Sequence, residues 1–152
     1  MAGFLLLLLQ TGHPAEAASP PDGAVRMSPG ELWDLYSGKT QLWKEGVGGY
    51  YFAPDRTLSG YSHRKVPTYA SGKWYITHSG KVCVVAAWVW GKGPQDRGPM
   101  EKNCWDHRKF GEQIWKNDGG WYHWNRSGGE SSRFIDGDKY RDLVTVLRAD
   151  LL

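Results

Sequence analysis

The densest group of residues that could perform chemistry is Asn103-Cys104-Trp105-Asp106-His107-Arg108. Asp106 and His107 could act as an acid/base pair, and Arg108 could bind an anion. Adjacent side chains of a strand point to opposite faces, however, so Asp106 and His107 cannot both serve one pocket. Asp106 and Arg108 share a face and could form an ion pair. The spacing therefore favours a structural role, ahead of ligand contact and of catalysis.

The remaining motifs give no stronger indication of an enzyme. The sequence contains no Gly-x-Ser-x-Gly nucleophile motif, no phosphate-binding glycine loop, no His-x-His pair and no Cys-x-x-Cys pair. Glu101, Asp106 and Glu112 are scattered rather than paired, and Asp136-Gly137-Asp138 lacks the other ligands of a calcium loop. We expect no catalytic residue, no metal site and no cofactor. A hydrolase centred on His107 requires that His107 and a carboxylate converge in a cleft.

Aromatic residues are the main candidates for ligand contact, since the chain has nine Trp and eight Tyr. Several of these rings fall on neighbouring predicted strands. They either fill the core or line a lumen and a sugar-stacking platform. The candidate ligand-binding residues are Trp88, Trp90, Trp105, Asp106, His107, Arg108, Trp121 and Trp124.

The N-terminal residues indicate an exported protein. An apolar run from Phe4 to Leu9 precedes Ala15-Glu16-Ala17, a small-x-small cleavage pattern, so residues 1–17 are predicted to be a signal peptide. The run is too short to span a membrane. In the periplasm or outside the cell, Cys83 and Cys104 would pair as a disulfide; in a cytosolic protein they would be two reduced, buried thiols. The leader favours the disulfide.

These residues must be positioned by a mainly β domain over residues 28–147, between a flexible arm at 18–27 and a tail at 148–152. Ser28, Pro29 and Glu31 form a helix start with a capping box, and the short helix ends before Gly38. Eight strand-like segments then follow at short intervals, separated by turn signals such as Pro54-Asp55-Arg56 and Ser79-Gly80. They lie at 41–44, 49–53, 58–63, 73–77, 81–90, 104–108, 112–116 and 121–125.

This pattern predicts a small antiparallel meander barrel of about seven or eight strands, lipocalin-like or avidin-like in outline. Segment 81–90 is apolar on both faces, so it must be central. One face would look into the lumen and the other needs a cover, for which the helix at 28–36 is suited. Residues 140–151 fit an amphipathic helix, with a closing strand at 143–147 as the alternative.

The formal net charge of +3 and the absence of a dense Lys/Arg run argue against nucleic-acid binding. We expect a monomer without a membrane span.

Several segments, taken in order, carry a family resemblance. They are Glu31-Leu32-Trp33-Asp34-Leu35-Tyr36, Gly49-Tyr50-Tyr51-Phe52-Ala53-Pro54-Asp55, Gly72-Lys73-Trp74-Tyr75, Lys81-Val82-Cys83, Cys104-Trp105-Asp106-His107-Arg108 and Gly120-Trp121-Tyr122. The set, over residues 28–140, resembles the domain of unknown function 995 family of small exported proteobacterial proteins. The resemblance implies an exported β-rich domain with paired cysteines, and it transfers no catalytic residue.

The leading hypothesis is an exported, non-catalytic barrel that binds a small ligand or a cell-envelope component through aromatic residues near its mouth. The alternative is a binder of proteins, for example an inhibitor of a wall-degrading enzyme. An open apolar lumen favours the first, whereas a filled core with a protruding loop at 91–99 favours the second.

Overall fold

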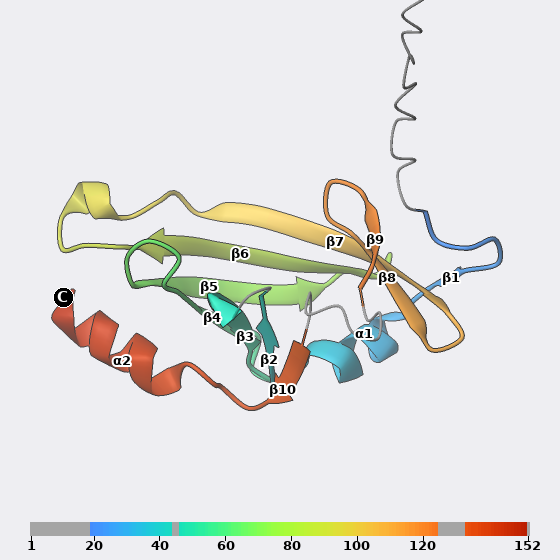
Figure 1. Cartoon of the computed structure of the whole chain (residues 1–152), viewed down its shortest axis with the longest axis horizontal. Coiled ribbons are helices and arrows are strands. Elements are labelled where there is room, and N and C mark those ends of the chain that lie inside the picture. The colour runs from blue at the N-terminus through green and yellow to red at the C-terminus, as the bar shows by residue number, and fades with distance from the viewer. Residues whose placement is uncertain (1–18, 44–45, 125–132, 152) are drawn as a thin grey trace, which may run out of the picture.

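The computed structural model describes residues 19–43, 46–124 and 133–151 as one curled antiparallel sheet with two short helices (Figure 1). The predicted signal peptide lies outside these residues. The strands are β1 (Val25–Arg26), β2 (Lys39–Leu42), β3 (Gly48–Phe52), β4 (Thr57–Ser62), β5 (Thr68–Ile76), β6 (Lys81–Val89), β7 (Glu101–Phe110), β8 (Gln113–Asn117), β9 (Trp121–His123) and β10 (Arg133–Asp136). The helices are α1 (Pro29–Tyr36) and α2 (Arg141–Asp150), with a 3-10 turn, η2, at Pro94–Asp96.

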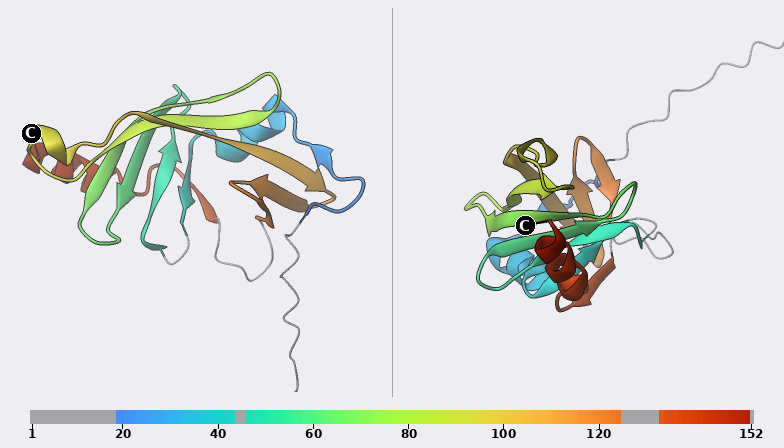
Figure 2. Two further views of the ribbon diagram at one scale, coloured as in Figure 1. Left: turned by 90° about the horizontal axis from the view of Figure 1, so that it is seen from above. Right: turned by 90° about the vertical axis from the view of Figure 1, so that its left-hand side faces the viewer.

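The strand order is β10-β2-β3-β4-β5-β6-β7-β8-β9, so consecutive strands from β2 to β9 form a meander and β10 returns beside β2. This confirms the mainly β, antiparallel meander with an N-terminal helix and decides for a helix at the C-terminus. The sheet differs from the expectation in its number of strands and in its closure. Nine strands curl into a half-barrel, with β9 and β10 at its two edges (Figure 2).

The two strands that the sequence did not reveal are β1 and β10. β1 adds two residues beside β7, pairing Val25 with Lys109 and Arg26 with Arg108, so the end of the expected arm is attached to the sheet. β10 pairs with β2, with Phe134 opposite Gln41. Both strands are short, and both pair with distant parts of the chain, which local periodicity does not report.

The helix α1 begins where its capping box predicts. The Glu31 amide donates to Ser28 Oγ, and the Ser28 amide donates to Glu31 Oε2. Leu32 and Tyr36 are fully buried against the sheet. The Glu31 carboxylate also pairs with Lys109 of β7, so α1 is attached to the sheet by both apolar and charged contacts.

Alternation along the strands gives the sheet an inner and an outer face. The inner face carries Phe52, Trp74 and Val84, and it packs on α1 within the main core. The outer face carries Tyr61, Tyr69 and Val89, which pack on Tyr140 and Val144 at α2. The central position of β6 between β5 and β7 is confirmed. The cover of the outer face is α2, however, because α1 occupies the inside of the curl.

The curl depends on close approach of neighbouring strands. A Cβ added to Gly72 of β5 would lie 2.0 Å from the Val85 carbonyl oxygen of β6, closer than any side chain permits. Glycine removes this conflict and lets the two strands bend together. β5 and β6 therefore wrap around α1 instead of forming a flat surface.

Candidate functional site

A pocket opens at the end of the inner face that lies away from α1. Its volume is approximately 380 Å³, and it is lined by Trp43, Tyr50, Ser62, Arg64, Thr68 and Trp88. Five of these residues lie on or directly beside strands β2 to β6, and Arg64 lies in the loop between β4 and β5. We call this hollow the aromatic pocket.

The strand register explains why large rings can stand here beside open space. Tyr50 is opposite Gly60, Gly60 is opposite Ala70, and Ala70 is opposite Trp88. This row runs across four strands and has a large ring at each end with small residues between them. A Cβ on Gly60 would lie 2.8 Å from the Tyr50 ring. The Tyr50 ring therefore lies over the glycine and reaches toward Trp88.

Three rings form the wall of the aromatic pocket. The ring centroids are 5.2 Å apart for Trp43 and Tyr50, 5.7 Å for Trp43 and Trp88, and 5.8 Å for Tyr50 and Trp88. Such separations are typical of aromatic contacts, so the three side chains support one another. Burial in this wall raises the pKa of the Tyr50 hydroxyl, which therefore stays protonated and can donate a hydrogen bond.

Polar groups stand opposite the rings. Ser62 and Thr68 are a cross-strand pair, and the Thr68 hydroxyl donates to the Ser62 carbonyl oxygen at 3.3 Å. Arg64 is exposed beside them and forms no ion pair within the described part of the chain. A ligand in the aromatic pocket would meet three aromatic rings, two hydroxyls and one cation.

A second group of candidate residues lies in the filled end of the half-barrel. His107 is fully buried, and its Nε2 lies 2.9 Å from the Tyr36 hydroxyl. Trp124 stacks on Tyr36 with ring centroids 5.7 Å apart. The buried Lys116 ammonium lies 3.8 Å from the centre of the Trp105 ring. These side chains join α1 to β7, β8 and β9.

Burial determines the charge of this interior group. Burial, and to a smaller extent the nearby Lys116, lower the pKa of His107 to about 3, so the imidazole is neutral. Burial also lowers the pKa of Lys116 to about 7. Contact with the Trp105 ring stabilises the charged form of Lys116. This single short contact offsets only part of the free-energy cost of removing the ammonium group from water.

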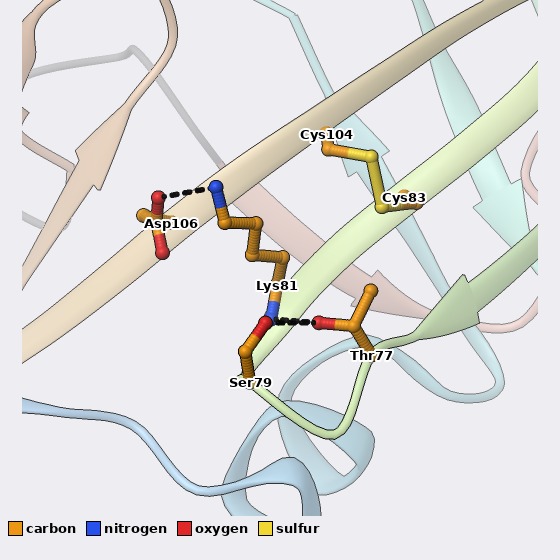
Figure 3. The surroundings of a disulfide bond; sticks show 6 residues. All are labelled: Thr77, Ser79, Lys81, Cys83, Cys104 and Asp106. Atoms are coloured by element: carbon orange, nitrogen blue, oxygen red, sulfur yellow. Dashed lines mark hydrogen bonds and ion pairs between the residues drawn. A yellow bond between two sulfur atoms is a disulfide. The ribbon is translucent and has the colours of Figure 1, made fainter.

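The geometry removes the basis for a hydrolase centred on His107. Asp106, the adjacent carboxylate, lies on the outer face, where it pairs with Lys81 at 3.1 Å (Figure 3) and with Arg26 at 3.5 Å. His107 is buried on the inner face and does not line the aromatic pocket. The ion pair expected between Asp106 and Arg108 is replaced by these partners.

The other predicted site residues are divided among different places. Trp88 of β6 lines the aromatic pocket. Trp90, which follows the end of β6, is exposed and lies outside that pocket. Trp105 and Trp124 are buried in the core. Arg108 lies on the outer face with its guanidinium 5.4 Å from the centre of the Trp121 ring.

The disulfide is confirmed. Cys83 of β6 and Cys104 of β7 are directly opposite each other in the register, with Cα atoms 4.1 Å apart (Figure 3). The bond joins two central strands on the outer face, next to the Lys81–Asp106 ion pair.

Sequence reasoning missed five residues of the aromatic pocket: Trp43, Tyr50, Ser62, Arg64 and Thr68. Tyr50 belongs to the cross-strand row through Gly60, and Ser62 and Thr68 form a second cross-strand pair two residues further along the same two strands. Both relations become visible only when the register is known. The residues that the structure describes contain no group of three or more His, Cys, Asp or Glu side chains suited to hold a metal ion. No helix among them has the length and apolarity needed to cross a membrane.

The model of a family described as protein of unknown function (DUF995) matches residues 4–145, which confirms the resemblance found in the sequence. No curated protein and no solved structure gives a significant match.

Proposed function

The chain belongs to the DUF995 family, and from this membership and the aromatic pocket we propose that it is an exported, non-catalytic protein that binds a sugar ring of a cell-envelope glycan. The observation that carries the proposal is the wall of Trp43, Tyr50 and Trp88 facing two hydroxyls and an arginine. Aromatic faces stack on the C–H face of a sugar ring, while hydroxyl and cationic groups bind its polar edge.

The size and composition of the pocket support a small ligand. Ligand pockets commonly enclose about 300–1,000 Å³ and combine apolar walls with a few directed polar groups. The aromatic pocket, at approximately 380 Å³, is at the lower end of this range and suits one ring of a longer chain. Arg64 provides a cation for a carboxylate, so an acidic sugar should bind more tightly than a neutral one.

Export is supported by two features. The leader at residues 1–17 has the apolar run and the cleavage pattern of a signal peptide. The Cys83–Cys104 disulfide is of the kind that persists in an oxidising compartment such as the periplasm.

Isothermal titration of the disulfide-bonded protein with a trimer of galacturonate and a trimer of N-acetylglucosamine tests the sugar site. Trp43→Ala should weaken both sugars at least tenfold, whereas Arg64→Gln should weaken only the acidic one. Trp121→Phe, a change on the outer face, is the matched control and should leave both affinities unchanged. Absence of binding by the unaltered protein, or unchanged affinities for the Trp43 variant, would exclude this function.

A protein-directed binder is the second candidate, because the segment between β6 and β7 projects from one end of the molecule (Figure 1). Its flanks expose Trp90 by 43% and Met100 by 60%. An inhibitor of a wall-degrading enzyme would slow the clearing of a cell-wall suspension by lysozyme. A Trp90→Ser/Met100→Ser double variant should lose that effect, and an unaffected clearing rate with the unaltered protein would exclude lysozyme as the target.

A further inference from the structure

A second hollow lies on the outer face, beside α2. Two adjacent depressions of approximately 310 and 430 Å³ share Tyr69, Val89 and Arg97, so they form one continuous groove. We call it the outer groove. Its other lining residues include Lys92, Met100, Arg148 and Leu151. None of them belongs to the aromatic pocket.

The floor of the outer groove is apolar. Tyr69 and Val89 are opposite each other on β5 and β6, and both are buried beneath it. Met100 is 60% exposed at one side, and Leu151 lies at the other, after α2. An exposed methionine beside a buried apolar floor leaves adaptable apolar surface without a partner in the described chain.

The rim of the outer groove is positively charged. Lys92, Arg97 and Arg148 line it, and its described lining contains no Asp or Glu. No ion pair joins these three cations to any residue in the ranges that the structure covers. The nearest loop carboxylate, Asp96, accepts a hydrogen bond from the Gly93 amide at 3.0 Å and caps η2. The charge of the rim therefore remains available to a ligand.

Two of the cations are held in position. The Arg148 guanidinium lies 5.3 Å from the centre of the Tyr69 ring, so α2 presents this charge directly over the floor. Arg97 forms an isolated antiparallel β-bridge with Val89. On either side of it, the Trp90 amide donates to the Asp96 carbonyl oxygen and the Gly98 amide donates to the Trp88 carbonyl oxygen. The loop is thereby attached to the end of β6, which places Arg97 at the centre of the groove.

We propose that the outer groove binds a single-chain anionic amphiphile, with its phosphate or carboxylate head at Arg97 and Arg148 and its alkyl chain along Tyr69, Val89 and Met100. Charge complementarity requires an anion, because three cations surround the groove without acidic partners. The apolar floor requires a ligand with more than a headgroup, since a free anion would leave that surface exposed.

The test uses decyl phosphate below its micelle-forming concentration. Inorganic phosphate, which has only the headgroup, and decanol, which has only the alkyl chain with an uncharged end, are the two comparison ligands. The protein is labelled with ¹³C at its methionine methyl groups, of which the sequence has three: Met1, Met27 and Met100. Decyl phosphate should shift the Met100 signal and leave the Met27 signal, buried beside α1, unchanged. Met100→Leu assigns the signal.

Arg97→Gln/Arg148→Gln should weaken decyl phosphate at least tenfold, whereas Lys65→Gln/Lys73→Gln, two exposed cations that line neither hollow, should leave it unchanged. Decanol binding as tightly as decyl phosphate would overturn the need for an anion. If inorganic phosphate bound as tightly as decyl phosphate, the groove would be a site for anions alone, and the proposal of an amphiphile would be overturned. Unchanged affinity in the groove variant, or an unshifted Met100 signal, would overturn the site.

Discussion

The Tyr36 hydroxyl lies 2.9 Å from Nε2 of His107, and the two residues are 71 positions apart in the chain. Both side chains are buried, so this contact joins α1 to β7 without competition from water. It is the polar centre of an otherwise aromatic core formed by Phe52, Trp124 and Phe134 around Tyr36. The position of α1 inside the half-barrel therefore depends on a specific polar contact as well as on apolar burial.

Removal of this hydroxyl should destabilise the fold. Tyr36→Phe leaves Nε2 of His107 buried without its partner, and the expected loss is about 1–3 kcal/mol in the free energy of unfolding. Urea unfolding followed by tryptophan fluorescence measures it. Tyr75→Phe, on the partly exposed end of β5, should cost much less. Equal losses for the two variants would show that the buried contact contributes nothing.

Acid should destabilise the protein through His107. The folded state lowers the pKa of His107 to about 3, below the value of about 6.5 in an unfolded chain. The unfolded state therefore binds the proton first, and stability should fall as the pH decreases from about 6.5, by up to about 1.4 kcal/mol per pH unit. Unfolding curves between pH 7.5 and 5 should show this slope, and His107→Leu should reduce it. An unchanged slope in that variant would assign the effect to other groups.

Lys116 should reduce stability at neutral and acid pH. Its pKa in the folded state is about 7, below the value of about 10.4 in an unfolded chain, because burial disfavours the ammonium form. Lys116→Met should therefore stabilise the protein at pH 6, by about 2–4 kcal/mol. The advantage should shrink between pH 7 and pH 10, where the buried amine loses its proton. Lys73→Met, an exposed change on β5, should show no such dependence, and a destabilised Lys116 variant would contradict the prediction.

The aromatic pocket should depend on the missing side chain at Gly60. In Gly60→Ala the new methyl group would lie 2.8 Å from the Tyr50 ring, so the ring must move from its place beside Trp88. We expect sugar affinity to fall at least fivefold, together with a loss of about 1–3 kcal/mol in stability. Gly30→Ala on α1 is the control for affinity, because a Cβ added to Gly30 has no atom within 4 Å. Undiminished sugar affinity in the Gly60 variant would show that the position of the Tyr50 ring does not matter for ligand binding.

The disulfide should contribute strongly to stability. Cys83→Ala/Cys104→Ala removes a bond that closes a segment of 21 residues, and the expected cost is roughly 3 kcal/mol. Thermal unfolding of the double variant and of the reduced native protein should give similar, lower midpoints. Intact-mass measurement with and without reductant should differ by about two daltons, the mass of the two hydrogens gained, and no difference would contradict the bond.

Local elements were predictable because their determinants are close in sequence. Ser28, Pro29 and Glu31 define the start of α1 within four residues. Pro54-Asp55-Arg56 and Ser79-Gly80 identify hairpin turns in the same way, and Arg56 and Gly80 have the positive φ angles that such turns require. Apolar alternation on both faces of 81–90 correctly indicated a central strand.

The candidate site was much less predictable, because it depends on register across strands. Trp88 was selected from the sequence, but its neighbours Tyr50, on β3, and Trp43, directly after β2, precede it by about 40 residues. The position of α1 inside the half-barrel was also not predictable, because it too depends on how distant segments are arranged in space. The pattern of Leu32 and Tyr36 shows which side of the helix is buried, but it does not show which face of the sheet buries it.

The return of β10 to β2 has a consequence for the order in which the chain can fold. Phe134 pairs with Gln41, and Glu31 of α1 pairs with Lys109, so β2 and α1 complete their contacts only after most of the chain is available. Contacts this distant in sequence slow folding, because a long loop must close before they form. During synthesis α1 would leave the ribosome long before β7 and β10, so the complete sheet around it can form only late, as the proposed export of an unfolded chain would require.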